Sequence, residues 1–439
     1  MSPELISILV LVAMFVLATV FPINIGILAF VAAFVLALTL TDLDGETLLE
    51  EGFDSDLVVT LIGITLLFAM ARSNGTIDWL VAVAIRAVRG RLVAIPWVMF
   101  AITGVLTAFG AVSPAAVAII APVALGFAYR FQINPLLMGI MVVHGAQAGG
   151  FSPISIYGTI TNQIVERNDL EGSPLTIFLA SLFFNLAIAI VGFFVFGGRK
   201  LLSRRTHDSE WEDEGAGSPS TGPAGGGTAT ATDTRATTSL TPTLYQVVTL
   251  VGLIALGVAT LVYELQIGLT ALALALVLAL LSPGSQKSAI QHVSWSVVLL
   301  IAGVLTYVYV LEELGTVEYA GNSVLKVGVP LLAALLLCYV GGIVSAFASS
   351  TALLPFIIPL AVPLLQEGGI GAVGMVAALA VSSTVVDVSP FSTNGALVLA
   401  NSAEDDQDTV YRKLLIFGFS VVAIAPFVAW AVMVAPGWL

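Results

Sequence analysis

The chain has 439 residues, of which 58% are apolar and only 10% are charged, and its formal net charge is −13. A soluble domain carries about 25% charged residues, so this composition excludes a water-soluble enzyme and predicts a protein whose solvent is the lipid bilayer. The acidic balance argues against a nucleic-acid partner, and the single cysteine, Cys338, excludes a disulfide framework.

Ten apolar runs are long enough to cross about 30 Å of hydrocarbon as helices. In chain order they extend over residues 5–22, 23–40, 57–71, 135–165, 175–197, 244–263, 267–281, 293–311, 373–400 and 414–434. We expect the runs at 135–165 and 373–400 to be broken helices, because Pro153 and Pro390 interrupt the backbone hydrogen bonding within them.

Two further stretches, 92–129 and 329–365, are each as long as two short helices and have small and polar residues in their middle. Each predicts either two thin crossings or one re-entrant hairpin, because both arrangements return the chain to the side it left. Non-helical backbone at membrane depth is tolerated only inside protein or beside a cavity, so a hairpin would mark a functional site. The amphipathic segments before them, 76–90 and 316–328, predict interfacial helices, with ordinary loops as the alternative.

Positive charges set the predicted orientation, because Lys and Arg stay preferentially in the cytoplasm. With the N-terminus outside, only Arg167 and Lys326 among the 15 Lys and Arg residues fall outside. Residues 199–243 are rich in Gly, Ser, Thr and Pro and predict a flexible cytoplasmic linker. We therefore expect a multi-pass protein of the cytoplasmic (inner) membrane with both termini outside.

The two halves of the sequence repeat each other. Segment 75–79 returns at 315–319 and segment 152–158 returns at 389–395, at offsets of 240 and 237 residues. An odd number of crossings in each half inverts the second copy, and inverted repeats with broken helices are typical of secondary transporters. The predicted fold is an all-α polytopic membrane protein with inverted repeats at 1–198 and 244–439, each with five crossings, one of them broken, and one re-entrant hairpin.

The hairpin tips are the predicted substrate site. Ser113 and Pro114 are typical of an N-cap followed by the first helical residue, and Ser350 or Thr351 is a candidate cap for the second hairpin. Free backbone N–H groups at such helix starts bind carboxylates without Lys or Arg. The predicted substrate-binding residues are Ser113, Pro114, Ser155, Ser349, Ser350, Thr351 and Asn394.

The helix breaks are the predicted ion-coupling site, because unwound carbonyls and hydroxyls supply the hard oxygens that a small cation prefers. Asp387 is the only carboxylate deep inside a predicted crossing, which indicates a proton carrier or a counter-charge, with a helix cap or ion pair as the alternative. His144 indicates either a proton sensor or a hydrogen-bonded structural histidine. The predicted ion-coupling residues are His144, Ser152, Asp387, Ser389, Ser392 and Thr393, with sodium as one candidate ion near Ser350, Ser392 and Asn394.

Several runs resemble a known family. Segments 74–81, 96–100, 114–119 and 144–158 are similar to malonate/dicarboxylate carriers of the MatC type. The resemblance is dense from about residue 24 to 198 and thinner in the second half, where it rests on 345–355 and 382–397. It implies membership of the wider ion transporter superfamily, which includes divalent-anion/sodium symporters, and with it a homodimer formed through scaffold helices and elevator-like movement.

In sodium-coupled members of that superfamily, Ser-Asn-Thr at each tip binds a substrate carboxylate and helps to hold sodium. The matching positions here are Val-Ser-Pro at 112–114 and Ser-Ser-Thr at 349–351, both without asparagine. Sodium and proton coupling therefore both stay open, the latter through Asp387 or His144.

The leading hypothesis is a secondary transporter that imports a small malonate-like dicarboxylate with a sodium or proton gradient and needs no further cofactor. The alternatives are a superfamily member that moves another anion or exchanges cations for protons and, from a different class, a channel or the membrane subunit of a larger complex. The sequence has no P-loop, zinc-protease motif or nucleophile elbow, so neither ATP-driven pumping nor enzymatic hydrolysis is predicted.

Overall fold

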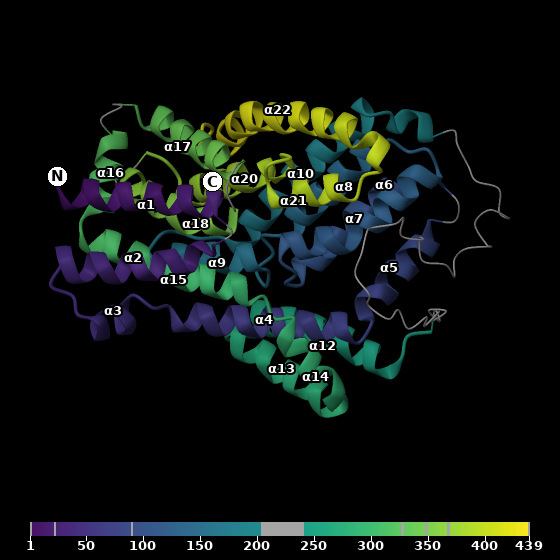
Figure 1. Cartoon of the computed structure of the whole chain (residues 1–439), viewed down its shortest axis with the longest axis horizontal. Coiled ribbons are helices and arrows are strands. Elements are labelled where there is room, and N and C mark those ends of the chain that lie inside the picture. Colours follow the sequence, from purple (N-terminus) through teal and green to yellow (C-terminus); the bar gives the residue numbers. More distant parts are fainter. Residues whose placement is uncertain are drawn as a thin grey trace.

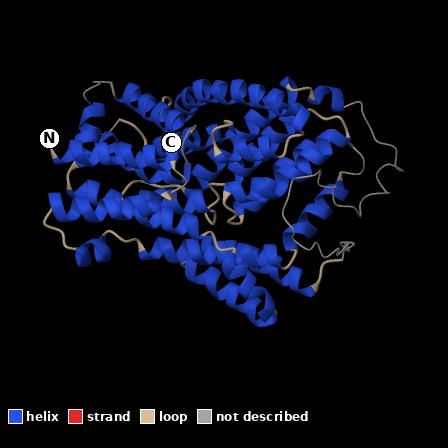
Figure 2. Cartoon of the chain, in the orientation of Figure 1, coloured by secondary structure: helices blue, strands red, loops and turns tan. Residues whose placement is uncertain are grey.

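The computed structural model describes residues 2–21, 23–88, 91–202, 241–325, 329–346, 350–366 and 369–437. All regular elements within these ranges are helices (Figure 2). The predicted all-α class is therefore confirmed for the described chain.

The helices of the first half follow the predicted elements. They are α1 (Pro3–Val20), α2 (Ile25–Leu40), α3 (Gly45–Glu51), α4 (Ser55–Ser73), α5 (Thr76–Ala87), α6 (Ala94–Ala108), α7 (Ser113–Arg130), α8 (Pro135–Gly149), α9 (Ile156–Arg167), α10 (Pro174–Val195) and the 3-10 turn η1 (Gly198–Leu201). The hairpin is α6 with α7, and the broken crossing is α8 with α9. The predicted linker starts inside η1, so its first residues are helical, and its residues 203–240 lie outside the described chain.

The second half has the same order of elements. They are α12 (Leu244–Tyr263), α13 (Ile267–Leu281), α14 (Pro283–Gln291), α15 (Trp295–Glu313), α16 (Thr316–Leu325), α17 (Pro330–Ser345), α18 (Ser350–Ile357), η2 (Pro359–Ala361), α19 (Val362–Gln366), α20 (Ala372–Thr384), η3 (Val385–Val388), α21 (Thr393–Ala400), η4 (Glu404–Asp406) and α22 (Gln407–Met433). The returning limb of the second hairpin is divided among α18, η2 and α19, because its prolines lack the N–H that a continuous helix needs. The short helices α3 and α14 lie outside the predicted elements.

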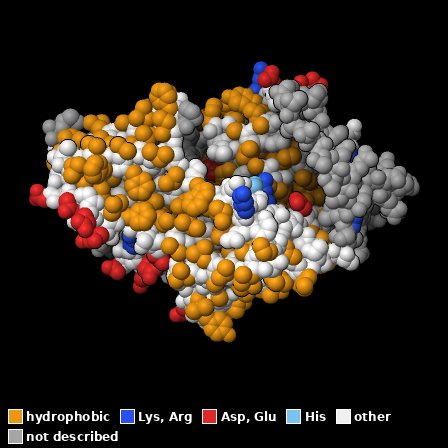
Figure 3. Space-filling model, turned by 60° about the horizontal axis from the view of Figure 1, so that its bottom comes forward, with side chains coloured by type: hydrophobic (Ala, Val, Ile, Leu, Met, Phe, Trp, Pro, Cys, Tyr) orange, Lys and Arg blue, Asp and Glu red, His pale blue; other side chains and the backbone are white. Residues whose placement is uncertain are grey.

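Apolar helices form much of the surface. Seven stretches of the described chain are long and apolar enough to cross a membrane, at 55–73, 113–130, 174–195, 244–263, 295–313, 372–400 and 404–433. Figure 3 shows hydrophobic side chains spread over one face, with many Asp and Glu side chains gathered at its left end, where Figure 1 places the N-terminus. These features are those of a multi-pass membrane protein.

The two halves run in opposite directions (Figure 1). α4 leads from α3, at the left of the view, to α5 at the right, whereas its counterpart α15 leads back from α14 to α16 at the left. α4 spans 55–73 and α15 spans 295–313, so the 240-residue offset holds over the whole helix. The repeat seen in the sequence is therefore an inverted repeat in space.

The halves interlock through close backbone contacts at glycines. α2 lies along α15, and a Cβ added at Gly26 would be 2.1 Å from Leu299 O. α13 lies along α4 in the same way, since a Cβ added at Gly63 would be 2.5 Å from Gly268 O. Each contact joins a helix of one half to a helix of the other, and such reciprocal pairs are expected when a pseudo-two-fold axis relates the halves.

Close packing also holds each hairpin against the broken helix of its own half. A Cβ at Gly149 of α8 would lie 1.9 Å from Gly104 O of α6, so these helices touch along their backbones. At the equivalent place in the second half, a Cβ at Gly341 of α17 would lie 2.6 Å from Ser383 Oγ of α20. These contacts bring the hairpin tips beside the helix breaks.

Candidate functional site

The helix break between α8 and α9 is shaped by a serine. The Ser155 hydroxyl donates to Gly150 O and to Ser152 O (2.6 Å), and it accepts from Gly158 N (3.3 Å). These bonds satisfy the backbone groups that the break frees, and they cap the first turn of α9.

The second break repeats these bonds at an offset of 237 residues. The Ser392 hydroxyl donates to Asp387 O and to Ser389 O (2.8 Å), and it accepts from Gly395 N (3.2 Å). Ser155 and Ser392 are thus engaged in shaping their own turns, and their expected ligand roles stay predictions.

A glycine is required at the same point of both breaks. A Cβ at Gly158 would lie 2.0 Å from Ser152 O, and a Cβ at Gly395 would lie 1.9 Å from Ser389 O. No side chain fits at such a distance from a carbonyl oxygen. The two breaks are therefore the same backbone turn, built once in each half.

The first hairpin tip lies against the first break. α6 ends at Ala108, whose carbonyl accepts from the Ser152 hydroxyl (2.7 Å), and Gly110 has a positive φ of 102°. The N-cap of α7 is Val112, which makes no side-chain capping bond. The prediction that Ser113 caps this helix is therefore wrong by one residue, because Ser113 is already the first helical residue. Its hydroxyl is available to side chains of other elements.

Side chains from four different elements form a buried hydrogen-bonded cluster with this hydroxyl. Ser113 Oγ accepts from Gln147 Nε2 of α8 (3.3 Å) and from Asn394 Nδ2 of α21 (2.9 Å). Gln147 Nε2 also donates to Asp387 Oδ2 in η3 (2.8 Å), and Ser350 Oγ of α18 donates to Asp387 Oδ1 (2.8 Å). Both hairpins and both broken helices thus meet in one place.

Tyr157, which no motif in the sequence singled out, also belongs to the cluster. Its phenol interacts with the side chains of Ser350 and Thr351 at the second tip, and with Gln147. Tyr157 stands in the repeated break at the position that Asn394 occupies in the second half. This correspondence is the sequence signal that identifies it once Asn394 is taken as a site residue.

The cluster is shielded from solvent. Ser350 and Asn394 are 1% exposed, and Asp387 is 6% exposed. The side chains that act on the Asp387 carboxylate are the neutral donors Ser350 and Gln147. An intramembrane carboxylate held by neutral donors is costly to bury, which makes it a functional group by default.

Several hydrogen-bond acceptors of the cluster have capacity to spare. Gln147 Oε1 and Asn394 Oδ1 are buried and have no hydrogen-bond partner in the described part of the chain. Each oxygen of Asp387 accepts one described side-chain hydrogen bond and has a further lone pair. An occupant that brings a hydrogen-bond donor or a positive charge would satisfy these oxygens.

His144 lies outside this cluster. It is fully buried on α8, its Nδ1 is 2.9 Å from Asn185 Oδ1 of α10, and its ring meets the edge of the Phe417 ring. Ser181 Oγ donates to Gln147 O, and Asn185 Nδ2 donates to Ser181 O, so hydrogen bonds of α10 side chains connect His144 to the cluster residue Gln147.

The other predicted residues have different positions. Pro114 is half-buried behind the first tip, and Ser389 Oγ accepts from Phe391 N (3.3 Å) within its own turn. Thr393 is exposed on the surface rather than in the cluster, although its neighbour Asn394 is central to it. Ser349 lies outside the described residues.

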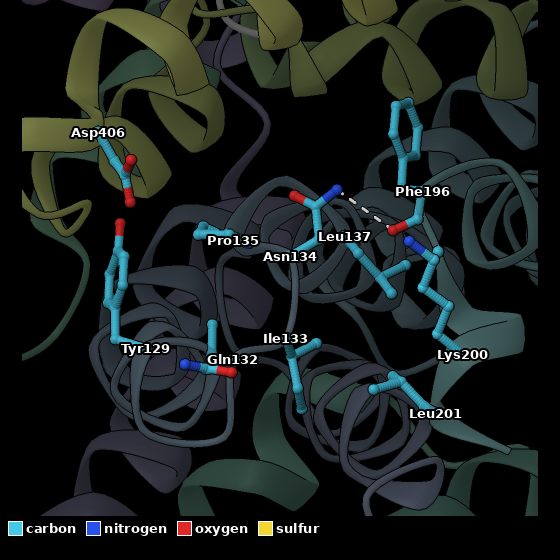
Figure 4. A pocket seen from close by; sticks show the side chains of 12 residues that line it. Tyr129, Gln132, Ile133, Asn134, Pro135, Leu137, Phe196, Lys200, Leu201 and Asp406 are labelled. Atoms are coloured by element: carbon cyan, nitrogen blue, oxygen red, sulfur yellow. Dashed lines mark hydrogen bonds between the residues drawn. The ribbon is translucent and has the colours of Figure 1, made fainter. Parts of the chain in front are cut away.

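A separate pocket of about 460 Å³ opens where α7 ends and α8 begins (Figure 4). Lys200 and Asp406 are charged residues in its lining, and Asn134 Nδ2 donates to Phe196 O across it (3.2 Å). The first turn of α8 is about 18 Å along that helix from Gln147, so this pocket is distinct from the buried cluster.

Comparisons with known proteins agree with this architecture. Residues 1–150 match the family model described as the N-terminus of the dicarboxylate carrier protein MatC, which confirms the resemblance over that region. The chain is similar in fold to the YdaH transporter of Alcanivorax borkumensis, whose crystal structure is described as revealing an unusual topology. The TM-score is 0.59 at 14% sequence identity, and the match covers 100% of this chain and 99% of that chain.

No curated protein sequence matches the chain. The family match supports a transporter rather than an enzyme, and the likeness to YdaH shows a shared fold.

Proposed function

We propose that the chain is a secondary transporter that imports a small dicarboxylate, malonate or a near relative, with a sodium or proton gradient. The observation that carries this proposal is the single buried cluster in which both hairpin tips and both helix breaks meet. Transporters built from inverted repeats bind substrate where their broken helices face each other. The match of residues 1–150 to dicarboxylate carriers supports the substrate class.

The cluster offers a carboxylate neutral hydrogen-bond donors. Ser113 Oγ accepts two hydrogen bonds, so the hydrogen of its hydroxyl is left to donate, and Asn394 Nδ2 has a second hydrogen. Thr351 and Tyr157 place further hydroxyls beside Ser350 at the second tip. A dicarboxylate has two ends, and each tip is suited to contact one of them.

Asp387 is the coupling residue in this proposal. It is bonded to the second tip through Ser350 and to the first half through Gln147, so a group that binds to its carboxylate acts on both halves at once. We expect the hairpins and broken helices to move as one unit against α2, α4, α13 and α15, in the elevator-like step and homodimer that the resemblance implies. We also expect the cytoplasmic membrane as the location, with both termini outside.

Uptake of labelled malonate into proteoliposomes tests the proposal, with sodium and proton gradients imposed separately. We expect saturable uptake that one of the two gradients accelerates. The variant Asn394→Ala should raise KM about tenfold, because it removes a donor to the first tip. Thr393→Ala is the matched control, since Thr393 is adjacent in sequence but exposed.

Two results would contradict the proposal at different levels. A lack of uptake of any dicarboxylate under either gradient would overturn the function. Unchanged kinetics in both Asn394→Ala and Ser350→Ala, in a protein that does transport, would overturn the assignment of the site.

A further inference from the structure

The two ends of the buried cluster differ in the hydrogen bonds that they can still make. At the first end, Ser113 Oγ already accepts from Gln147 and Asn394, so its own hydrogen is left to donate. Asn394 Nδ2 donates one of its two hydrogens to Ser113 Oγ and has the other left to donate. The first end is therefore equipped with donors for a carboxylate.

At the second end, the two side chains that are bonded to Asp387 have no donor left for a ligand. Ser350 Oγ gives its hydrogen to Asp387 Oδ1, and Gln147 Nε2 uses its hydrogens on Ser113 and on Asp387 Oδ2. The lone pairs that remain on Asp387 are acceptors, and Gln147 Oε1 is an acceptor that no described residue satisfies. A ligand group that binds to the Asp387 carboxylate must therefore itself donate a hydrogen bond.

Among the described residues, no positive side chain offsets the charge of Asp387 at this end. Tyr157 faces it from α9, and the elements packed against η3 are α8, α17, α20, α21 and α22. The titratable or charged side chains on those elements are His144, Cys338, Tyr339, Asp408, Tyr411, Arg412 and Lys413. His144 pairs with Asn185, Tyr339 donates to Ala423 O, and the side chains acting on Asp387 are Ser350 and Gln147.

We propose that the transporter takes its dicarboxylate as the singly protonated monoanion, with the carboxylate at Ser113 and Asn394 and the protonated carboxyl group donating to Asp387. The inference rests on the proposed function and specifies the charge state of its substrate. Two carboxylates in contact repel each other unless they hold one proton between them. The substrate brings that proton on its own carboxyl oxygen and leaves with it, so no covalent bond forms or breaks in the protein.

Three ligands test the proposed binding of the monoanion. Each has one carboxylate, and they differ in the group at the other end of the molecule. The second carboxyl group of malonate can ionise. Malonamate has a neutral amide donor in its place, and monomethyl malonate has a methyl ester there, with neither a charge nor a donor. Equilibrium binding of each to the purified full chain is measured between pH 6 and pH 8 without sodium, and again with sodium added. The wild-type protein suffices for the comparison, so it does not depend on the folding of a variant.

Each ligand has a different expected result. The apparent Kd of malonate should rise about tenfold per pH unit above its second ionisation, because only the protonated fraction binds. The Kd of malonamate should stay constant over the same range. Monomethyl malonate should bind at least about tenfold more weakly than malonamate, because it leaves Asp387 without a donor.

The variant Asp387→Asn should remove the preference for the singly protonated form of malonate. The amide N–H of the new side chain can donate to the second carboxylate of the dianion. Its malonate affinity should become independent of pH, whereas Thr393→Ala should keep the wild-type profile.

Wild-type malonate affinity that does not change with pH would overturn the inference and leave the proposed function standing. Sodium that restores malonate binding at pH 8 would also overturn it, since a metal cation would then take the place of the proton. Failure of all three ligands to bind, together with an absence of dicarboxylate uptake, would overturn the proposed function as well.

Discussion

The first helix break has Gly150 and Tyr157 where the second has Asp387 and Asn394. The backbone is the same in both, since the serine bonds and the tight glycine contacts recur. A Cβ at Gly150 would lie 2.9 Å from Tyr157 Cδ2, so the tyrosine ring fills the space that a side chain at position 150 would enter. An inverted repeat can thus keep its geometry while two substitutions confine the negative charge to one half.

The same comparison shows that neither half has a complete site. Asn394 of the second half donates to Ser113 at the first tip, and Tyr157 of the first half interacts with Ser350 at the second tip. The two contacts correspond under the 237-residue offset, because Tyr157 aligns with Asn394 and Ser113 aligns with Ser350. One contact runs from the second half to the first tip, and the other runs from the first half to the second tip. Each tip is completed by the break of the other half, so that movement of one half relative to the other would alter both tips.

The largest expected effect tests whether the two breaks are equivalent. Gly158→Ala and Gly395→Ala should each cost about 3 kcal/mol or more of stability, and by similar amounts, because the added Cβ overlaps a carbonyl oxygen in both. Thermal unfolding of the purified variants measures this. Gly252→Ala is the control, since a Cβ there meets nothing within 4 Å. A large cost at one break and none at the other would contradict the equivalence.

The next effect tests the charge that sets the halves apart. Asp387→Asn should reduce gradient-driven accumulation of malonate to passive equilibration, because it removes the charge that couples transport to the gradient, while exchange across the membrane continues. Proteoliposome uptake and counterflow measure the two activities separately. Asp405→Asn removes an exposed carboxylate and should leave both unchanged. Normal accumulation by Asp387→Asn would show that the asymmetry has no role in coupling.

The smallest effect compares the two tip serines. Ser350 donates to a carboxylate, whereas Ser113 accepts from two neutral amides. Ser350→Ala should therefore lower stability by about 2 kcal/mol and Ser113→Ala by about 1 kcal/mol. The difference in melting temperature between the two variants measures this, and a larger loss at Ser113 would mean that the charged bond is not the stronger one.

Much of the fold was predictable, because apolar runs, paired Ser-Pro segments and a repeat with a constant offset each have a direct structural consequence. The central positions of Ser113, Ser350 and Asn394 followed from that repeat, and that of Asp387 followed from its being the only carboxylate deep inside a predicted crossing. The role of Tyr157 did not, because a phenol in an apolar segment is typical of packing, and its partners are far away in sequence.

Two local features also needed the structure. Thr393 is exposed although both of its neighbours are buried, which depends on how α21 is rotated after the Ser392 cap. The pairing of α2 with α15 and of α13 with α4 depends on contacts between the halves, which hydrophobic periodicity within one helix does not specify.

The central claim is that the two tips bind one dicarboxylate together, and cysteine protection tests it most directly. Ser113→Cys and Ser350→Cys are made separately in a chain whose only natural cysteine is removed by Cys338→Ala. A small thiol reagent then labels each variant in proteoliposomes at increasing malonate concentrations. The account predicts that malonate slows labelling at both positions with the same half-saturating concentration. Protection at neither position, or at only one of them, would contradict it.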